Sequence, residues 1–294
     1  MSQINLEVVT KHCCLLGESP VWDDNQKRIL WVDILTGEIH YYYPDRSEHK
    51  SFKLDQMVGA IAIRESGGLV AALKSEFVII NLNKEKIELI SKVEIFLSDN
   101  RFNDGKCDPA GRFWAGTMSI SNKRYAGSLY SLEKDFSVNT KIIGVSCSNG
   151  MAWSPDYKTL YYIDTPNQNV VAYNYDIRSG SITDSRIVVS IPREEGYPDG
   201  MTIDTEGMLW VALWGGWKVI RYNPGNGKPL HQINLPVSQV TSCIFGGDKM
   251  EDLYITTAKT GLLKNDLIAQ PLAGSLFILK KSGFMGIKSF EYKG

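Results

Sequence analysis

Short apolar segments recur along the whole chain, each preceded by a turn-forming stretch. The apolar segments are residues 30–33 (LWVD), 69–72 (LVAA), 113–116 (FWAG), 161–164 (YYID), 209–212 (LWVA) and 253–256 (LYIT). The stretches before them are rich in Gly, Asp, Asn and Pro, which favour turns: 23–25, 66–68, 108–111, 154–156, 204–207 and 246–248. A further apolar segment follows each of them, at 39–43, 77–82, 128–132, 170–175, 218–222 and 275–279. The pattern predicts β-strands joined by tight turns.

The repeat also has a regular length. The residues that begin the first strand of each unit are Glu18, Gly59, Asn103, Asn149, Asp199 and Thr241, with spacings of 41, 44, 46, 50 and 42 residues. Units of about 40–50 residues with several strands are typical of β-propeller blades. We therefore predict an all-β, six-bladed β-propeller. It occupies residues 1–294 as a single domain, whereas the length alone would suggest two domains.

The two ends and two connections complete the predicted topology. Residues 6–10 and 287–292 are both strand-like, and one could supply the outer strand of the other's blade, closing the ring without a free edge. Residues 81–97 have apolar positions partly at helical spacing, but strands surround them, so we expect an outer strand there. Residues 257–273 form the longest connection, which is either a lid or an ordinary surface loop.

One position of the repeat carries candidate chemistry. The first strand of each propeller blade lines the central axis, so equivalent positions converge there. Four of these positions hold acid or amide oxygens: Glu18, Asn103, Asn149 and Asp199. Burying them is costly and two carboxylates repel, and a divalent cation would relieve both costs. Oxygen ligands suit Ca²⁺, Mg²⁺ or Mn²⁺, while Zn²⁺ also accepts carboxylates. The alternative interpretation is that the Asn-Gly and Asp-Gly pairs only mark turns before strands.

Charge and histidine content exclude several functions. The 32 basic and 33 acidic side chains give a net charge of −1, which disfavours a nucleic-acid partner. The four histidines are His12, His40, His49 and His231, and none falls in the convergent position. A Ser-His-Asp triad is therefore not expected, and we expect each histidine to be a surface or packing residue, with His49 and His231 in polar connections. The sequence contains neither a P-loop nor a dinucleotide-binding glycine motif.

The cysteines and the apolar runs indicate the compartment. The five cysteines are odd in number and lack metal-type CxxC spacing, which is typical of a reducing environment. We expect Cys13 and Cys14 to be packing residues at a strand end rather than a redox pair. The first residues do not resemble a secretory leader, and no apolar run approaches the roughly 20 residues of a membrane helix. A cytoplasmic protein without a membrane partner is expected.

An ordered set of motifs resembles a known family. The motifs are residues 16–22 (LGESPVW), 101–118 (RFNDGKCDPAGRFWAGTM), 148–154 (SNGMAWS), 160–164 (LYYID), 196–204 (GYPDGMTID) and 240–247 (VTSCIFGG). Together they resemble the senescence marker protein, gluconolactonase and luciferin-regenerating enzyme family. The resemblance implies a six-bladed propeller with one divalent metal ion in the axial tunnel, held by Glu18, Asn149 and Asp199. It also implies that Arg101 and Asn103 bind substrate hydroxyls.

The same resemblance implies hydrolysis of sugar (aldono-) lactones, so the expected partner is a small-molecule lactone. Asp199 would also act as the catalytic base, because a carboxylate near the metal can accept a proton from the attacking water. Residues 119–121 (SIS) depart from the acidic substrate contact that some members carry there. Tyr197, Trp214 and Trp217 form either an apolar rim for a sugar ring or packing between blades. The competing hypotheses are a non-catalytic calcium- or partner-binding propeller and a lactonase for non-sugar lactones or phosphotriesters.

Overall fold

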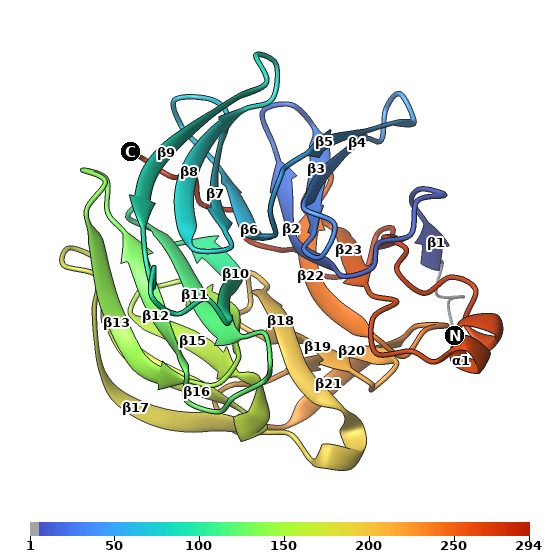
Figure 1. Ribbon diagram of the computed structural model, residues 1–294. Coiled ribbons are helices and arrows are strands. Elements are labelled where there is room, and N and C mark those ends of the chain that lie inside the picture. The colour runs from blue at the N-terminus through green and yellow to red at the C-terminus, as the bar shows by residue number, and fades with distance from the viewer. Residues whose placement is uncertain (1–5) are drawn as a thin grey trace.

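The computed structural model describes residues 6–294. Six four-stranded antiparallel sheets stand around a central axis, with the innermost strand of each sheet facing that axis (Figure 1). The predicted six-bladed β-propeller is therefore confirmed. Within the described part, the regular helical structure is one short helix, α1 (Lys264–Ala269), and two 3₁₀ turns, η1 (Thr165–Asn167) and η2 (Arg193–Glu195).

Five of the sheets consist of four consecutive strands, numbered from the axis outward. The first two are β2 (Gly17–Asp23), β3 (Arg28–Asp33), β4 (Glu38–Tyr43), β5 (Glu48–Lys53), and β6 (Val58–Ile63), β7 (Leu69–Leu73), β8 (Glu76–Asn81), β9 (Lys86–Lys92). The next two are β10 (Asn100–Cys107), β11 (Phe113–Ser119), β12 (Gly127–Leu132), β13 (Val138–Val145), and β14 (Ser148–Trp153), β15 (Thr159–Asp164), β16 (Asn169–Asp176), β17 (Ser181–Ser190). The fifth is β18 (Tyr197–Ile203), β19 (Leu209–Trp214), β20 (Lys218–Tyr222) and β21 (Pro229–Asn234).

The sixth sheet closes the ring with both ends of the chain. It contains β22 (Val240–Gly246), β23 (Asp252–Thr257), β24 (Phe277–Leu279) and, as its outer strand, β1 (Leu6–Val8). The prediction that a terminal segment completes another blade is confirmed for the N-terminal strand. The prediction that residues 287–292 are also strand-like is wrong, because they form no strand. The only ladder contact there is an isolated bridge of Tyr292 to Arg64, because β1 already occupies the outer edge of the sixth sheet.

Three other expectations concern particular segments of the chain. Residues 81–97 contain the outer strand β9, so the strand interpretation is confirmed over the helical one. The longest connection, residues 257–273, contains α1. His49 and His231 lie on the outermost strands β5 and β21, so the prediction of polar connections is wrong for both. These strands are largely exposed, and their polar composition therefore resembles that of loops.

Two of the turns before a second strand, at Asp108 and Asp204, also anchor their blades. The Asp108 carboxylate is fully buried and accepts hydrogen bonds from Trp114 Nε1 (2.9 Å), the Tyr175 hydroxyl (2.7 Å) and Arg112 Nη1 (3.1 Å). The equivalent Asp204 accepts hydrogen bonds from Trp210 Nε1 and the Arg221 side chain. Buried charges are stable when they are paired and hydrogen-bonded in this way. The turn aspartates therefore fix the indole of the second strand as well as the turn.

Candidate functional site

The innermost strands share an irregularity at the position that the repeat singled out. Each is interrupted by a β-bulge where it pairs with its second strand, between Glu18 and Val21, Val58 and Ala60, Phe102 and Asp104, Ser148 and Met151, Pro198 and Met201, and Val240 and Ser242. The aligned positions lie within these bulges or at their edges. A bulge redirects side chains that a regular strand would alternate between its two faces. The six bulges therefore bring these positions together at one end of the axis.

The Asn-Gly and Asp-Gly pairs do not form turns. Asn149-Gly150 lies in β14 and Asp199-Gly200 lies in β18. A Cβ atom on Gly200 would lie 2.1 Å from Ser242 Oγ of the next blade, and one on Gly150 would lie 2.7 Å from the carbonyl oxygen of Asp199. Glycine is required because neighbouring innermost strands approach too closely for any side chain. The turn interpretation of these pairs is therefore wrong.

Three of the proposed site residues lie close together. The Asn149 amide and the Glu18 carboxyl group are both near enough to Asp199 to affect the pKa of its side chain. The three side chains come from β14, β2 and β18, which belong to the fourth, first and fifth blades. All three are nearly inaccessible to solvent, with 3–6% of their surface exposed. Glu18 is 131 positions from Asn149 in the sequence and still farther from Asp199, yet the oxygen atoms of all three side chains form one compact group.

The electrostatics of this group are unfavourable without a counter-charge. Burial, followed by the carboxylates of Asp199 and Asp104, raises the pKa of Glu18 well above its usual range. Burial and the Asp104 carboxylate likewise raise the pKa of Asp199. Arg101 provides partial compensation for both carboxylates. The folded chain therefore holds three acidic groups near one another in a place where water solvates them poorly.

The group fits a divalent cation. The Nδ2 atom of Asn149 donates a hydrogen bond of 2.9 Å to the hydroxyl of Thr165, while its Oδ1 atom is buried without a hydrogen-bond partner. Buried polar atoms almost always have partners, so an unpartnered oxygen beside two carboxylates calls for a ligand. Carboxylate and amide oxygens are the donors preferred by hard cations such as Ca²⁺ and Mg²⁺. A cation there would also offset the carboxylate charges.

Arg101 and Asn103 lie beside this group on β10. The guanidinium of Arg101 is buried, and its Nη1 atom donates to Asn103 Oδ1 (2.7 Å) and to the carbonyl oxygen of Phe102 (2.9 Å). Asn103 Nδ2 in turn donates to the carbonyl oxygen of Ser148 (2.8 Å). Asn103 therefore holds Arg101 in position between the third and fourth blades. Its amide bonds are directed at the protein, so its clearest role in this structure is to orient Arg101.

Three residues near the site were not predicted from the sequence: Asp104, Lys106 and Thr165. Asp104 follows Asn103 directly, and its carboxylate contributes to the raised pKa of both Glu18 and Asp199. Its position in the same motif was the available signal. Burial lowers the pKa of Lys106, which the nearby Asp104 opposes, and Lys106 Nζ donates 2.7 Å to the carbonyl oxygen of Met201. Thr165 begins η1, outside any repeated position, and no sequence signal identifies it.

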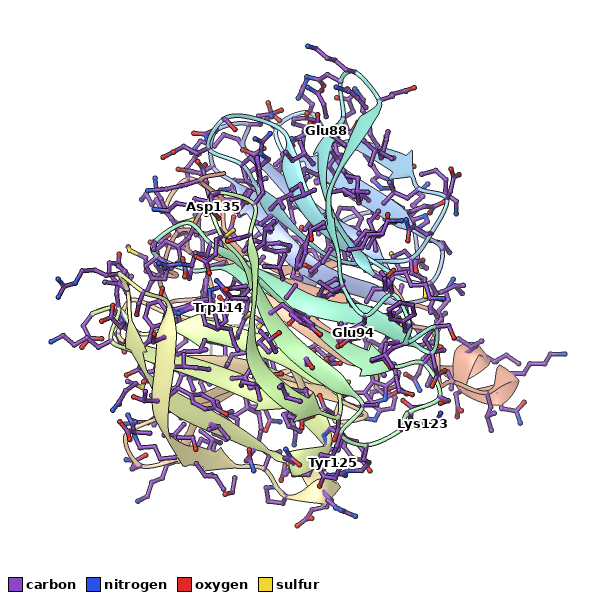
Figure 2. The ribbon with its side chains drawn as sticks, turned by 60° about the vertical axis from the view of Figure 1, so that its left-hand side comes forward. Glu88, Glu94, Trp114, Lys123, Tyr125 and Asp135 are labelled. Atoms are coloured by element: carbon purple, nitrogen blue, oxygen red, sulfur yellow. The ribbon has the colours of Figure 1, made fainter. Side chains whose placement is uncertain are left out.

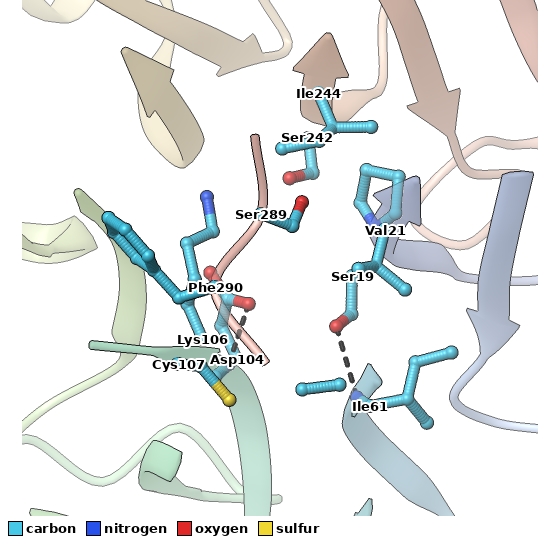
Figure 3. A pocket seen from close by; sticks show the side chains of 13 residues that line it. Ser19, Val21, Ile61, Asp104, Lys106, Cys107, Ser242, Ile244, Ser289 and Phe290 are labelled. Atoms are coloured by element: carbon cyan, nitrogen blue, oxygen red, sulfur yellow. Dashed lines mark hydrogen bonds between the residues drawn. The ribbon is translucent and has the colours of Figure 1, made fainter. Parts of the chain in front are cut away.

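The axial space continues beyond Asp104. A pocket lined by Ser19, Asp104, Lys106 and Ser242 is crossed by the C-terminal segment that carries Ser289 (Figure 3). Ser19 Oγ accepts a hydrogen bond of 3.3 Å from the backbone N–H of Ile61, which joins the first two blades inside the pocket. The C-terminal segment therefore covers one end of the axis. The oxygen group lies toward the other end, where the innermost strands begin.

The residues around the end of the axis where the innermost strands begin include aromatic and acidic side chains. Tyr197 and Trp217 are each 44% exposed, and Tyr197 pairs with Trp214 at the end of the fifth blade where β18 begins. In the third blade, the Ser119 hydroxyl donates 2.7 Å to the carboxylate of Asp99. The loop that follows carries Lys123 and Tyr125 (Figure 2). An acidic group therefore lies beside residues 119–121 although these residues are not themselves acidic.

All five cysteines are free thiols, and none forms a disulfide within the chain. Among residues 6–294, no helix is long and apolar enough to cross a membrane.

The sequence and the fold both resemble those of known proteins. Residues 16–259 match the SMP-30/Gluconolactonase/LRE-like region. Regucalcin from Oryctolagus cuniculus is 40% identical over 299 residues, which cover 100% of both chains. A solved luciferin-regenerating enzyme superposes with a TM-score of 0.92 at 32% identity, covering 98% of this chain and 99% of that one. The crystal structure of a calcium-binding protein, regucalcin, from Agrobacterium tumefaciens has a TM-score of 0.93 at 28% identity, with 97% and 96% coverage.

Proposed function

Because the chain belongs to the SMP-30/gluconolactonase/LRE-like family, we propose that it is a metal-dependent hydrolase that opens sugar lactones to the corresponding acids. The observation that carries the proposal is the unpartnered Oδ1 atom of Asn149, buried beside the axial carboxylates. Glu18, Asn149 and Asp199 would hold the cation. Three protein ligands leave further coordination positions for water and substrate, as a catalytic site requires.

A divalent cation at this site would act as a Lewis acid for the carbonyl oxygen of the lactone. Asp199 would accept the proton of the attacking water, because its carboxylate belongs to the ligand group. Proton acceptance leaves a hydroxide-like nucleophile directed at the carbonyl carbon. The ring C–O bond then breaks, and the departing alkoxide takes up a proton to give the hydroxy acid.

Arg101, held in position by Asn103, would select substrates that carry hydroxyl groups. Arg101 has one nitrogen fixed by Asn103, so its guanidinium is held at a defined angle beside the carboxylates. A fixed donor orients a bound sugar lactone at little entropic cost. The exposed rings of Tyr197 and Trp217 could contact the apolar face of a sugar. We therefore expect polyhydroxylated lactones to be better substrates than aliphatic lactones.

The test is acid release from a panel of aldonolactones and aliphatic lactones in a pH-stat. Chelator-treated protein would be compared with protein reloaded with Ca²⁺, Mg²⁺, Mn²⁺ or Zn²⁺. We expect turnover of aldonolactones that disappears with the chelator and returns with a metal ion. Asp199→Asn should lose activity by at least about 100-fold, in the range of general-base removal. The matched control is Asp156→Asn, which makes the same change at an exposed turn of the fourth blade.

Three outcomes would contradict the proposal in different ways. Cation binding without turnover of any lactone would identify a non-catalytic binding protein. Faster hydrolysis of aliphatic lactones than of aldonolactones would remove the role given to Arg101. Full turnover by a folded Asp199→Asn protein would remove Asp199 from the chemistry. Circular dichroism of each variant establishes that it is folded.

A further inference from the structure

Three of the four histidines meet at the edge of the first blade, away from the axis. His12 lies in the connection from β1 to β2, His40 on β4 and His49 on β5. Their ring centroids are 4.2 Å apart for His12 and His40, and 5.3 Å apart for His40 and His49. The Cys14 thiol joins them, and donor atoms of His12, Cys14 and His40 all lie within 4.8 Å of one another. Imidazole and thiolate are the ligands that borderline and soft metal ions prefer.

The hydrogen bonds of the cluster leave its nitrogen atoms available. Nε2 of His12 and Nε2 of His40 are both buried without a hydrogen-bond partner. The other ring nitrogen of His40, Nδ1, lies 3.2 Å from Nε2 of His49. Metal-bound histidines commonly use the second ring nitrogen in such a bond, which fixes the orientation of the ring. Burial, with His12 and His49 nearby, also lowers the pKa of His40 to about 3, so its ring is neutral.

The surroundings also suit a cation bound through sulfur. Trp31 Nε1 donates a hydrogen bond of 3.4 Å to Cys14 Sγ, whereas burial and the Asp33 carboxylate raise the pKa of the Cys14 thiol, so the thiolate needs a bound cation beside it. The Glu38 carboxylate lies 3.5 Å from His40 Nε2 without forming a hydrogen bond to it. Ligands about 2.0–2.3 Å from a tetrahedral ion are about 3.3–3.6 Å from one another. The separation of Glu38 from His40 already matches, and His12, Cys14 and His40 need to approach one another by at most about 1 Å.

We propose that His12, Cys14 and His40 form a second metal site, for a borderline transition ion of the Zn²⁺ type, with Glu38 placed as the fourth ligand. Binding converts the Cys14 thiol to a thiolate and releases its proton to solvent. The site is separate from the axial oxygen group in both position and donor chemistry. It concerns this chain's own residues and does not depend on the proposed hydrolase activity.

The position of the site suggests what a bound ion would do. His12 and Cys14 belong to the connection that leaves the sixth sheet, and the backbone N–H of Cys14 still donates 2.8 Å to the carbonyl oxygen of Gly274 in that region. His40 and Glu38 belong to the first sheet. An ion held by both groups would fasten the seam at which the ring closes. Because the ion binds the folded form, loading should raise the melting temperature.

The test uses Co²⁺ as a spectroscopic probe. A cobalt–thiolate bond produces a near-ultraviolet charge-transfer band, which the oxygen-only axial site cannot produce. We expect the band in the wild-type protein and its loss in Cys14→Ser. It should also be lost or strongly weakened in His12→Gln, a substitution in a connection that the fold tolerates. Excess Zn²⁺ should remove the band by displacement, because Zn²⁺ binds such ligands more tightly than Co²⁺.

Two controls separate this site from its surroundings. Cys13→Ser makes the same atomic change one residue away, where the thiol faces Ser275 Oγ at 3.5 Å, and it should keep the band. Asp199→Asn should also keep it, whether or not that variant hydrolyses lactones. Absence of the band in the wild-type protein would show that the cluster is aromatic packing only. A band that survives in folded Cys14→Ser would likewise overturn the assignment.

Discussion

Replacing Thr165 with valine tests whether the axial site depends on the orientation of Asn149. The Thr165 hydroxyl accepts a hydrogen bond of 2.9 Å from Asn149 Nδ2 and donates one of 2.8 Å to the carbonyl oxygen of Pro198. It thereby links the Asn149 side chain to the residue that precedes Asp199. Valine has nearly the same shape but cannot make either bond. The amide of Asn149 would then be free to rotate its oxygen away from the carboxylates.

The expected magnitude follows from these two bonds. A net contribution of about 0.5–1.5 kcal/mol for each bond predicts a loss of about 1–3 kcal/mol of folding stability. Removal of a group that orients a metal ligand typically lowers metal affinity by about 10–100-fold. This loss corresponds to about 1.4–2.8 kcal/mol of binding free energy. Thr165→Ser retains the hydroxyl and should bind metal nearly as well as the wild type.

Isothermal titration calorimetry of chelator-treated protein with Ca²⁺ measures the affinity, and urea unfolding measures the stability. The decisive comparison is a double-mutant cycle with Asn149→Ala, in which Thr165→Val should have almost no further effect on affinity. If Thr165→Val lowers affinity equally in both backgrounds, Thr165 acts independently of Asn149. Unchanged affinity in Thr165→Val would refute the argument that this hydroxyl sets the site.

The other predictions concern packing, anchoring and metal removal. Gly200→Ala should lower the free energy of unfolding by about 1–3 kcal/mol, because the new Cβ would overlap Ser242 Oγ. An unchanged melting temperature in thermal denaturation would contradict the close approach of the two strands. Asp108→Ala should cost about 3–5 kcal/mol, because it leaves the buried donors of Trp114 and Tyr175 without an acceptor, and a loss under 1 kcal/mol in urea unfolding would show that water replaces the carboxylate. When the free metal concentration is about 100 times the dissociation constant, removal of the metal by a chelator should lower the free energy of unfolding by about 2.7 kcal/mol. A melting temperature insensitive to chelator would argue against any metal bound to the folded state.

The fold could be predicted from the sequence because the blades repeat the same pattern of turns and apolar strands. A turn such as the one at Asp108 precedes an apolar second strand, and the buried acceptor role of the aspartate explains why this residue recurs at Asp204. The outermost strands were harder to recognise. Strands β5 and β21 are mostly exposed, so their side chains are polar and lack the alternation that identifies a half-buried strand.

Phase within the repeat also located the axial group, because the bulges stand at the same place in every blade. Asp104 was missed for a related reason. It follows Asn103 directly, and regular alternation would point it away from its neighbour, but the bulge between Phe102 and Asp104 breaks the alternation. The cluster of His12 and His40 follows no repeat at all. It depends on how the connection after β1 crosses the first sheet, which one-dimensional spacing does not encode.

The two proposed sites differ in donor type, and this difference predicts the order in which they fill. Zn²⁺ prefers imidazole and thiolate, so it should load His12, Cys14 and His40 before the axial oxygen atoms. The first equivalent of Zn²⁺ added to chelator-treated protein should then raise the melting temperature without supporting hydrolysis, and only the second should restore activity. Ca²⁺ and Mg²⁺ avoid such ligands and should restore activity from the first equivalent. Stepwise titration with parallel thermal and pH-stat measurements tests this order, and His12→Gln should abolish the silent first step. Full activity at the first equivalent of Zn²⁺ in the wild type would show that the axial site binds zinc more tightly, contrary to the donor argument.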